Sequence, residues 1–187
     1  MVDKPPPATP TKSRLHDAAL RHLARYATTS AGLLRVLNRR IDRWARATAA
    51  EPEAALALRD LAKQEIASLL QAGLLDDAAF ANMRAQSLTR AGKSRRGIAA
   101  HLAVRGVPSA VARDALPDDP DAEFAAALAL ARKRRIGPFA VTEPDPARRP
   151  RDLAAFARAG FSQDMAQRAL RMDPTDAQTM LRDWRQK

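Results

Sequence analysis

The chain has 187 residues, of which 46% are hydrophobic and only 4% aromatic; its apolar share is mostly Ala and Leu, which favours closely packed helices over a sheet. Its 32 Lys and Arg residues against 21 Asp and Glu residues give a formal charge of +11, so a polyanion is an expected partner. The absence of cysteine excludes disulfides and thiolate metal sites, and without an apolar amino-terminal segment we expect a cytoplasmic protein with no membrane partner.

The first part of the chain is predicted to hold a disordered leader and one extended helical repeat. Residues 1–13 are rich in Pro and Thr, which is typical of a disordered segment. In the repeat, residues 14–75, a Thr-Thr-Ser cap precedes a leucine-rich helix that is expected to run on through residues 38–48. A further helix after Pro52 is predicted to carry Leu56, Leu61, Ile66, Leu69 and Leu70 as far as Gly73.

Internal repetition predicts two more units. An Asp-Ala pair at Asp17, Asp77 and Asp121 is expected to open a helix, because the carboxylate can cap free backbone N–H groups. The sequence around Gly106 returns around Gly160: a helix stops at the Gly, a hydrophobe follows, and another helix begins. We therefore predict a second repeat over residues 76–118, a third over 119–172 with an inserted loop at 135–152, and a C-terminal helix over 173–187.

The predicted units are each too small to bury a core alone. Such units are stable when they are stacked on their neighbours. The sequence therefore predicts an all-α protein that forms an elongated, curved array of tandem three-helix repeats.

The tripeptide Gly92-Lys93-Ser94 matches the end of the phosphate-binding loop G-x-x-x-x-G-K-[ST]. The position of the first glycine is occupied by Ser87, and the preceding residues carry a helical pattern instead of the buried strand that such a loop needs. The sequence therefore disfavours an ATP site, and we expect the chain to bind no cofactor.

No set of residues converges on catalysis. His16, His22 and His101 do not stand in a metal-ligand spacing with an acidic partner, and structural roles are expected for them. Ser94 has no evident base to activate it. We therefore predict a protein that is not an enzyme, with no catalytic residue and no metal ligand.

The basic residues are better organised. No Asp or Glu occurs between Ala78 and Arg113. Ser94 is expected to cap the next helix, which puts Arg95 and Arg96 in its first turn, where cations oppose the helix dipole by about 0.3–1 kcal/mol each. A bound anion would remove this cost, although two arginines that extend into solvent are the simpler alternative. The candidate contacts to a partner or to DNA phosphates are Arg90, Lys93, Arg95, Arg96, Arg105, Arg132, Lys133, Arg134, Arg135, Arg39 and Arg40.

Two observations limit what these cations are expected to recognise. The run from Arg132 to Arg135 also suits the C-terminal end of a helix without any ligand. The aromatic residues Tyr26, Trp44 and Trp184 do not interleave with the basic clusters in the sequence, so no base-stacking platform is predicted. Contacts to phosphates with weak sequence preference are expected instead.

Residues 66–116 resemble the central repeat of the RecX regulatory proteins. In that family a helix that ends in Gly and a hydrophobe leads into Asp-Asp-x-x-Phe-Ala, a basic Gly-Lys turn and a closing Gly-hydrophobe pair. The matching residues here are Gly73 to Ala81, Gly92-Lys93, Ile98, Leu102 and Gly106-Val107. Residues 19–40 are similar to the family's opening repeat, and the resemblance extends over roughly residues 14–172.

The resemblance implies an array of tandem three-helix repeats. It also implies binding to the RecA recombinase, chiefly its nucleoprotein filament, and restraint of filament extension, ATP hydrolysis and strand exchange in recombinational repair and the SOS response. The family has no catalytic residues to carry over, and single- or double-stranded DNA would be contacted through phosphates. The alternative is a general, sequence-independent DNA-binding helical protein. A monomer is expected in either case.

Overall fold

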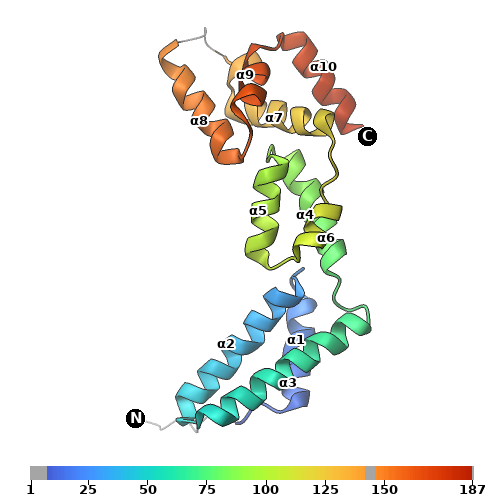
Figure 1. The fold of residues 1–187 in the computed structure, drawn as a ribbon, viewed down its shortest axis with the longest axis vertical. Helices are drawn as coiled ribbons and strands as arrows, with labels where there is room; N and C mark the ends of the chain where they lie inside the picture. The colour runs from blue at the N-terminus through green and yellow to red at the C-terminus, as the bar shows by residue number, and fades with distance from the viewer. Residues whose placement is uncertain (1–7, 142–145, 187) are drawn as a thin grey trace. The chain divides into compact units, whose positions relative to one another are not determined.

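The computed structural model describes residues 8–141 and 146–186. All of their regular structure is helical, as α-helices and short 3-10 helices (Figure 1). The chain divides into two compact units: unit 1 is residues 1–80 with 105–107, and unit 2 is residues 81–104 with 108–187. The predicted all-α repeat fold is confirmed for the described residues, whereas the elongated, curved arrangement of the array stays a prediction.

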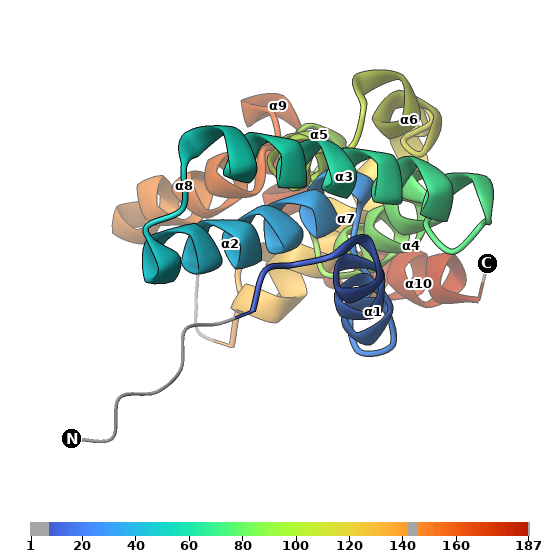
Figure 2. The same cartoon turned by 90° about the horizontal axis from the view of Figure 1, so that it is seen from below.

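Unit 1 is built on three helices, α1 (Lys12–Leu23), α2 (Ser30–Thr48) and α3 (Pro52–Gln71). The Thr29 hydroxyl accepts a hydrogen bond from the Gly32 N–H at 2.9 Å and so caps α2, which runs on to Thr48 as predicted. Figures 1 and 2 both show α2 and α3 side by side. The core between the helices contains Leu15, Ala19, Leu33, Leu37, Ile41, Trp44, Leu58, Ile66 and Leu69.

The start of α1 differs from the prediction. Asp17 lies inside this helix and caps nothing, because Thr11 already accepts the Arg14 N–H at 3.3 Å one turn earlier. Residues 1–7 of the predicted leader lie outside the described residues, and α1 begins at Lys12, within the range predicted for that leader. Of the apolar residues that α3 carries as predicted, Leu56 and Leu70 lie on its solvent face, and they are 57% and 42% exposed.

Unit 2 contains the remaining helices; only the first turn of α4 and the last residue of α5 belong to unit 1. The elements are α4 (Asp77–Arg90), α5 (Arg95–Arg105), α6 (Ser109–Asp114), α7 (Pro120–Arg134), η1 (Gly137–Phe139), η2 (Pro146–Arg148), α8 (Arg149–Ala159), α9 (Gln163–Arg171) and α10 (Pro174–Arg185). Helix α8 begins inside the loop predicted over 135–152, of which residues 142–145 lie outside the described residues.

The helix ends predicted from the repeats are confirmed at both glycines. Helix α5 ends before Gly106 and α8 ends at Gly160, and these glycines have φ angles of +82° and +95°. A hydrophobe follows each of them, Val107 or Phe161, and is buried. Ser162 then caps α9, whose Met165 N–H it accepts at 3.2 Å.

Two helices also begin with an acidic residue as predicted, but the residue that caps each helix lies upstream of the predicted one. Asp77 and Asp121 lie in the first turns of α4 and α7. Asp76 accepts the Ala79 N–H at 2.8 Å, and Asp119 accepts the N–H groups of Asp121 and Ala122 at 3.0 and 2.9 Å. The carboxylate that caps each helix therefore precedes the one that the repeat pattern selected.

Helix α7 forms the centre of the C-terminal core. Every residue from Phe124 to Ala131 is buried. Helices α9 and α10 pack directly on α7, and α8 packs on α9 (Figure 1). Leu181 of α10 is 1% exposed, and Met180 and Trp184 pack against the same core. Among the described residues, no helix combines the length and apolarity that crossing a membrane requires.

Candidate functional site

The turn between α4 and α5 carries the Gly-Lys-Ser tripeptide. Gly92 has a φ of +80°, and a Cβ added there would lie 2.7 Å from the backbone nitrogen of Leu130 in α7. Glycine is required because it tolerates the left-handed backbone and lets another helix approach this closely. The packing of α7 therefore explains this glycine without a nucleotide.

Ser94 connects the ends of two helices. Its hydroxyl accepts the Gly97 N–H at 2.9 Å and so caps α5, as predicted. The hydroxyl also donates to the Ala159 carbonyl at 3.0 Å, and the Ser94 N–H donates to the same oxygen at 3.2 Å. Ala159 is the last residue of α8, where carbonyls lack partners within the helix. Ser94 is completely buried in this arrangement.

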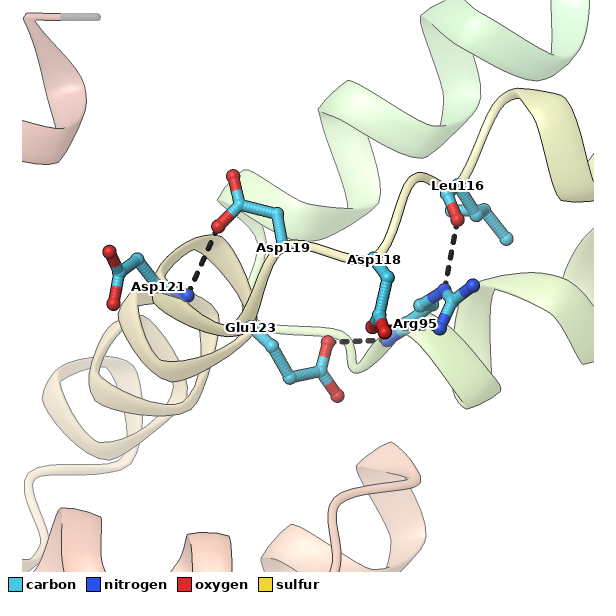
Figure 3. Close-up of polar contacts among 6 residues, drawn as sticks. All are labelled: Arg95, Leu116, Asp118, Asp119, Asp121 and Glu123. Carbon is cyan, nitrogen blue, oxygen red and sulfur yellow. Dashed lines mark hydrogen bonds and ion pairs between the residues drawn. The ribbon is translucent and has the colours of Figure 1, made fainter.

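Arg95 forms hydrogen bonds with its own chain through both its backbone N–H and its side chain (Figure 3). Its backbone N–H donates to Glu123 Oε2 at 2.8 Å. Its side chain donates through Nε to the Leu116 carbonyl at 2.9 Å and through Nη1 to Asp118 Oδ1 at 3.0 Å. A carboxylate of α7 thus already occupies the N-terminus of α5, where the sequence suggested that an external anion could dock. The sequence did not reveal this because Glu123 lies 28 residues further along the chain.

Two cations of this turn remain for an external ligand. The side chains of Lys93 and Arg96 are exposed, and no residue of the described part of the chain forms a hydrogen bond or ion pair with either. Arg90 has weak bonds to the Gln86 carbonyl and side-chain oxygen, both at 3.4 Å. We define Lys93 and Arg96 as the basic turn, the two predicted contacts between α4 and α5 whose side chains have no bond to the described part of the chain.

The basic residues at the end of α7 are placed as a helix terminus favours. Arg132, Lys133 and Arg134 form its last turn, where cations interact favourably with the helix dipole. Arg135 follows as the C-cap with a φ of +55°. This arrangement accounts for the cluster without a ligand, so its role as a contact surface stays a prediction.

The remaining predicted contacts lie in unit 1. The Arg105 carbonyl accepts the Thr29 hydroxyl at 2.7 Å and Arg35 Nη2 at 3.1 Å, while the Arg105 side chain is exposed. Arg39 and Arg40 are both exposed on α2, and Arg40 lines a groove between α1 and α2 that Arg39 does not line.

The sequence reasoning missed most of the residues that line this groove. Besides Arg40 they include Arg14, Arg21, Arg25, Tyr26 and Arg43. Arg14 and Arg21 recur on one face of α1 at a spacing of seven residues, and that spacing was the signal that could have found them, whereas Arg25 follows the helix. Among the described residues, no group of three or more His, Cys, Asp or Glu side chains is placed to hold a metal ion.

The sequence and structure comparisons with known proteins agree with one another. The sequence model of the family described as "RecX, second three-helix domain" matches residues 76–116. The protein called Regulatory protein RecX in Myxococcus xanthus is 43% identical over 164 residues, which cover 86% of each chain. The protein of that name in Mycobacterium marinum is 35% identical over 170 residues, 88% of this chain and 89% of the relative. A crystal structure of a regulatory protein RecX has a similar fold, with a TM-score of 0.62 and 21% identity over 83% of this chain and 70% of that chain.

Proposed function

This chain belongs to the RecX family of regulatory proteins, and on that premise we propose that it binds the RecA recombinase and regulates the nucleoprotein filament that RecA forms on DNA. The observation that carries the proposal is the sequence identity of 43% over 86% of both chains. In our proposal the chain restrains filament extension, ATP hydrolysis and strand exchange. The chain needs no catalytic residue for this, because the nucleotide is bound and hydrolysed by the partner.

A binding protein can change the ATP turnover of its partner without chemistry of its own. If it binds one state of the filament better than another, it shifts the filament toward that state by its difference in affinity. The basic turn is a suitable contact, because Lys93 and Arg96 are exposed cations on a rigid support: Gly92 and Ser94 on either side of Lys93 are packed against α7 and α8. Each unit also buries a core of its own, which supports action as a monomer. The cytoplasm is the location that we propose for it.

The proposal is tested by the steady-state ATP turnover of RecA on single-stranded DNA, with increasing amounts of this chain. We expect turnover to fall as the chain is added. Lys93→Ala combined with Arg96→Ala should raise the half-inhibiting concentration by about tenfold, the effect of losing about 1.4 kcal/mol of binding free energy.

A matched variant controls for the loss of two positive charges. Arg113 and Arg158 are also exposed in unit 2, and neither was selected as a contact. Replacing both with Ala should leave inhibition unchanged. Equal losses in the two variants would remove the basic turn from the interface, and unchanged RecA turnover at saturating wild-type chain would contradict the proposed inhibition.

A further inference from the structure

The groove between α1 and α2 is lined by cations on both walls. It consists of two hollows of about 300 and 430 Å³ that share Arg40 and Arg43 of α2. The opposite wall is formed by α1 and the residues that directly follow it; both helices are labelled in Figure 2. We define the arginine groove by its cationic and aromatic residues, Arg14, Arg21, His22, Arg25, Tyr26, Arg40, Arg43 and Trp44.

The positive charge of the arginine groove is not neutralised by the described part of the chain. The side chains of Arg21, Arg25, Arg40 and Arg43 form no hydrogen bond or ion pair with any described residue. Two carboxylates of unit 1 are engaged elsewhere: Asp42 of α2 pairs with Arg59 at 2.7 Å, and the buried Glu65 of α3 pairs with His16 at 2.8 Å. Asp17, one helical turn from Arg21, places a single negative charge near these four arginines. A cleft lined by charges of one sign concentrates the electric field and attracts ligands of the opposite sign.

The two large aromatic residues of the groove differ in their exposure. Tyr26 is 59% exposed at one end of the groove, and its ring lies 5.1 Å from the His22 ring, centroid to centroid. Trp44, at the other end, is only 8% exposed, and its indole Nε1 is buried with no acceptor among the described residues. Tyr26 therefore offers a ring face to a ligand, whereas the Trp44 ring is largely enclosed.

We propose that the arginine groove binds single-stranded nucleic acid. Phosphates contact the arginines of the two walls, and a base stacks on Tyr26. An exposed aromatic ring beside a cationic track suits a single strand, because its bases are free to stack, whereas those of a duplex are paired and internal. Stacking of this kind tolerates any base, so binding is independent of sequence. This site goes beyond the proposed function, since it requires no recombinase.

The first test measures the anisotropy of a fluorescent oligothymidylate with the full chain in the absence of RecA. Arg40→Ala combined with Arg43→Ala should weaken binding and reduce the slope of log affinity against log salt by about 1.4, from about 0.7 per phosphate contact on a single strand. The control is Arg46→Ala combined with Lys63→Ala, which removes the same charge from exposed positions of unit 1 outside the groove. It should leave the slope unchanged, and equal changes in both variants would overturn the proposal.

The second test separates base stacking from phosphate attraction. Tyr26→Ala should weaken binding of oligothymidylate about fivefold or more, since stacking contributes about 1–3 kcal/mol per base. Binding of an abasic phosphodiester strand of equal length should not change. A Tyr26→Ala effect of equal size on both strands would overturn the stacking. If poly-glutamate displaced the oligothymidylate at equal charge concentration, the groove would be a site for acidic protein segments instead. Since RecA is absent, neither result bears on the proposed inhibition.

Discussion

Ser94 is the residue on which the ends of two helices in unit 2 depend. Its single hydroxyl accepts the Gly97 N–H at the start of α5 and donates to the Ala159 carbonyl at the end of α8. Because Ser94 is completely buried, water has little access to replace either bond. A buried polar group that loses its partner costs more than an exposed one, since the exposed group can turn to solvent.

We therefore predict that Ser94→Ala lowers the free energy of unfolding by about 2 kcal/mol, whereas Ser162→Ala lowers it by about 0.5–1 kcal/mol. Ser162 is the matched control, because it caps α9 through the Met165 N–H but is exposed. Urea unfolding followed by circular dichroism measures both values. Equal losses would show that the bond to Ala159 contributes nothing beyond the cap.

The roles of Ser94 and Arg95 differ in how well they could be predicted from the sequence. The cap at Ser94 was predictable, because its acceptor role is local and depends on the next three residues. The role of Arg95 was not: its partners Asp118 and Glu123 are distant in sequence, and only the packing of α5 near α7 brings them together. The sequence pattern therefore selected Arg95 and Arg96 alike, although the Arg95 side chain is bonded within the fold and the Arg96 side chain is not.

Helix α7 is the element around which the C-terminal core forms. Its middle section alternates Ala and Leu with no polar face, and all of its residues from Phe124 to Ala131 are buried. A helix that is apolar all round must be covered on every side. Small Ala side chains let the neighbouring helices approach closely, so the section has little room for added volume.

Substitution of a larger residue in α7 should therefore be costly. Ala127→Leu should lower the free energy of unfolding by about 1–3 kcal/mol, because extra methylene groups force neighbouring side chains and backbone apart. Ala127 is 0% exposed, whereas Ala100 in α5 is exposed and Ala100→Leu is the control, with an effect within about 0.5 kcal/mol. Thermal and urea unfolding measure both, and a neutral Ala127→Leu would contradict this close packing.

At the scale of elements, the success of prediction depended on how local the signal was. Gly106 and Gly160 were correctly read as helix ends, because a left-handed residue there strongly favours glycine. Asp17 was wrongly read as a helix start, because Asp also occurs inside helices and Thr11 was the better cap. The groove between α1 and α2 forms only when the two helices pack together. The sequence alone therefore did not place Tyr26 and Trp44 beside the arginines of the groove.

The whole molecule consists of two units, each with its own hydrophobic core. The basic turn belongs to unit 2, and the arginine groove belongs to unit 1. Substitutions of exposed residues in one unit leave the core of the other unchanged. On our two proposals, separate surfaces bind the two ligands, and each surface uses part of the net charge of +11.

This division predicts that the two binding activities can be lost independently. Lys93→Ala with Arg96→Ala should weaken inhibition of RecA and leave binding of oligothymidylate unchanged. Arg40→Ala with Arg43→Ala should do the reverse, because the cations that it removes lie in the other unit. Each variant is measured in both assays, with circular dichroism to verify the fold. If either pair of substitutions reduced both activities together, the basic turn and the arginine groove would act as one site, and the separation of functions between the units would be wrong.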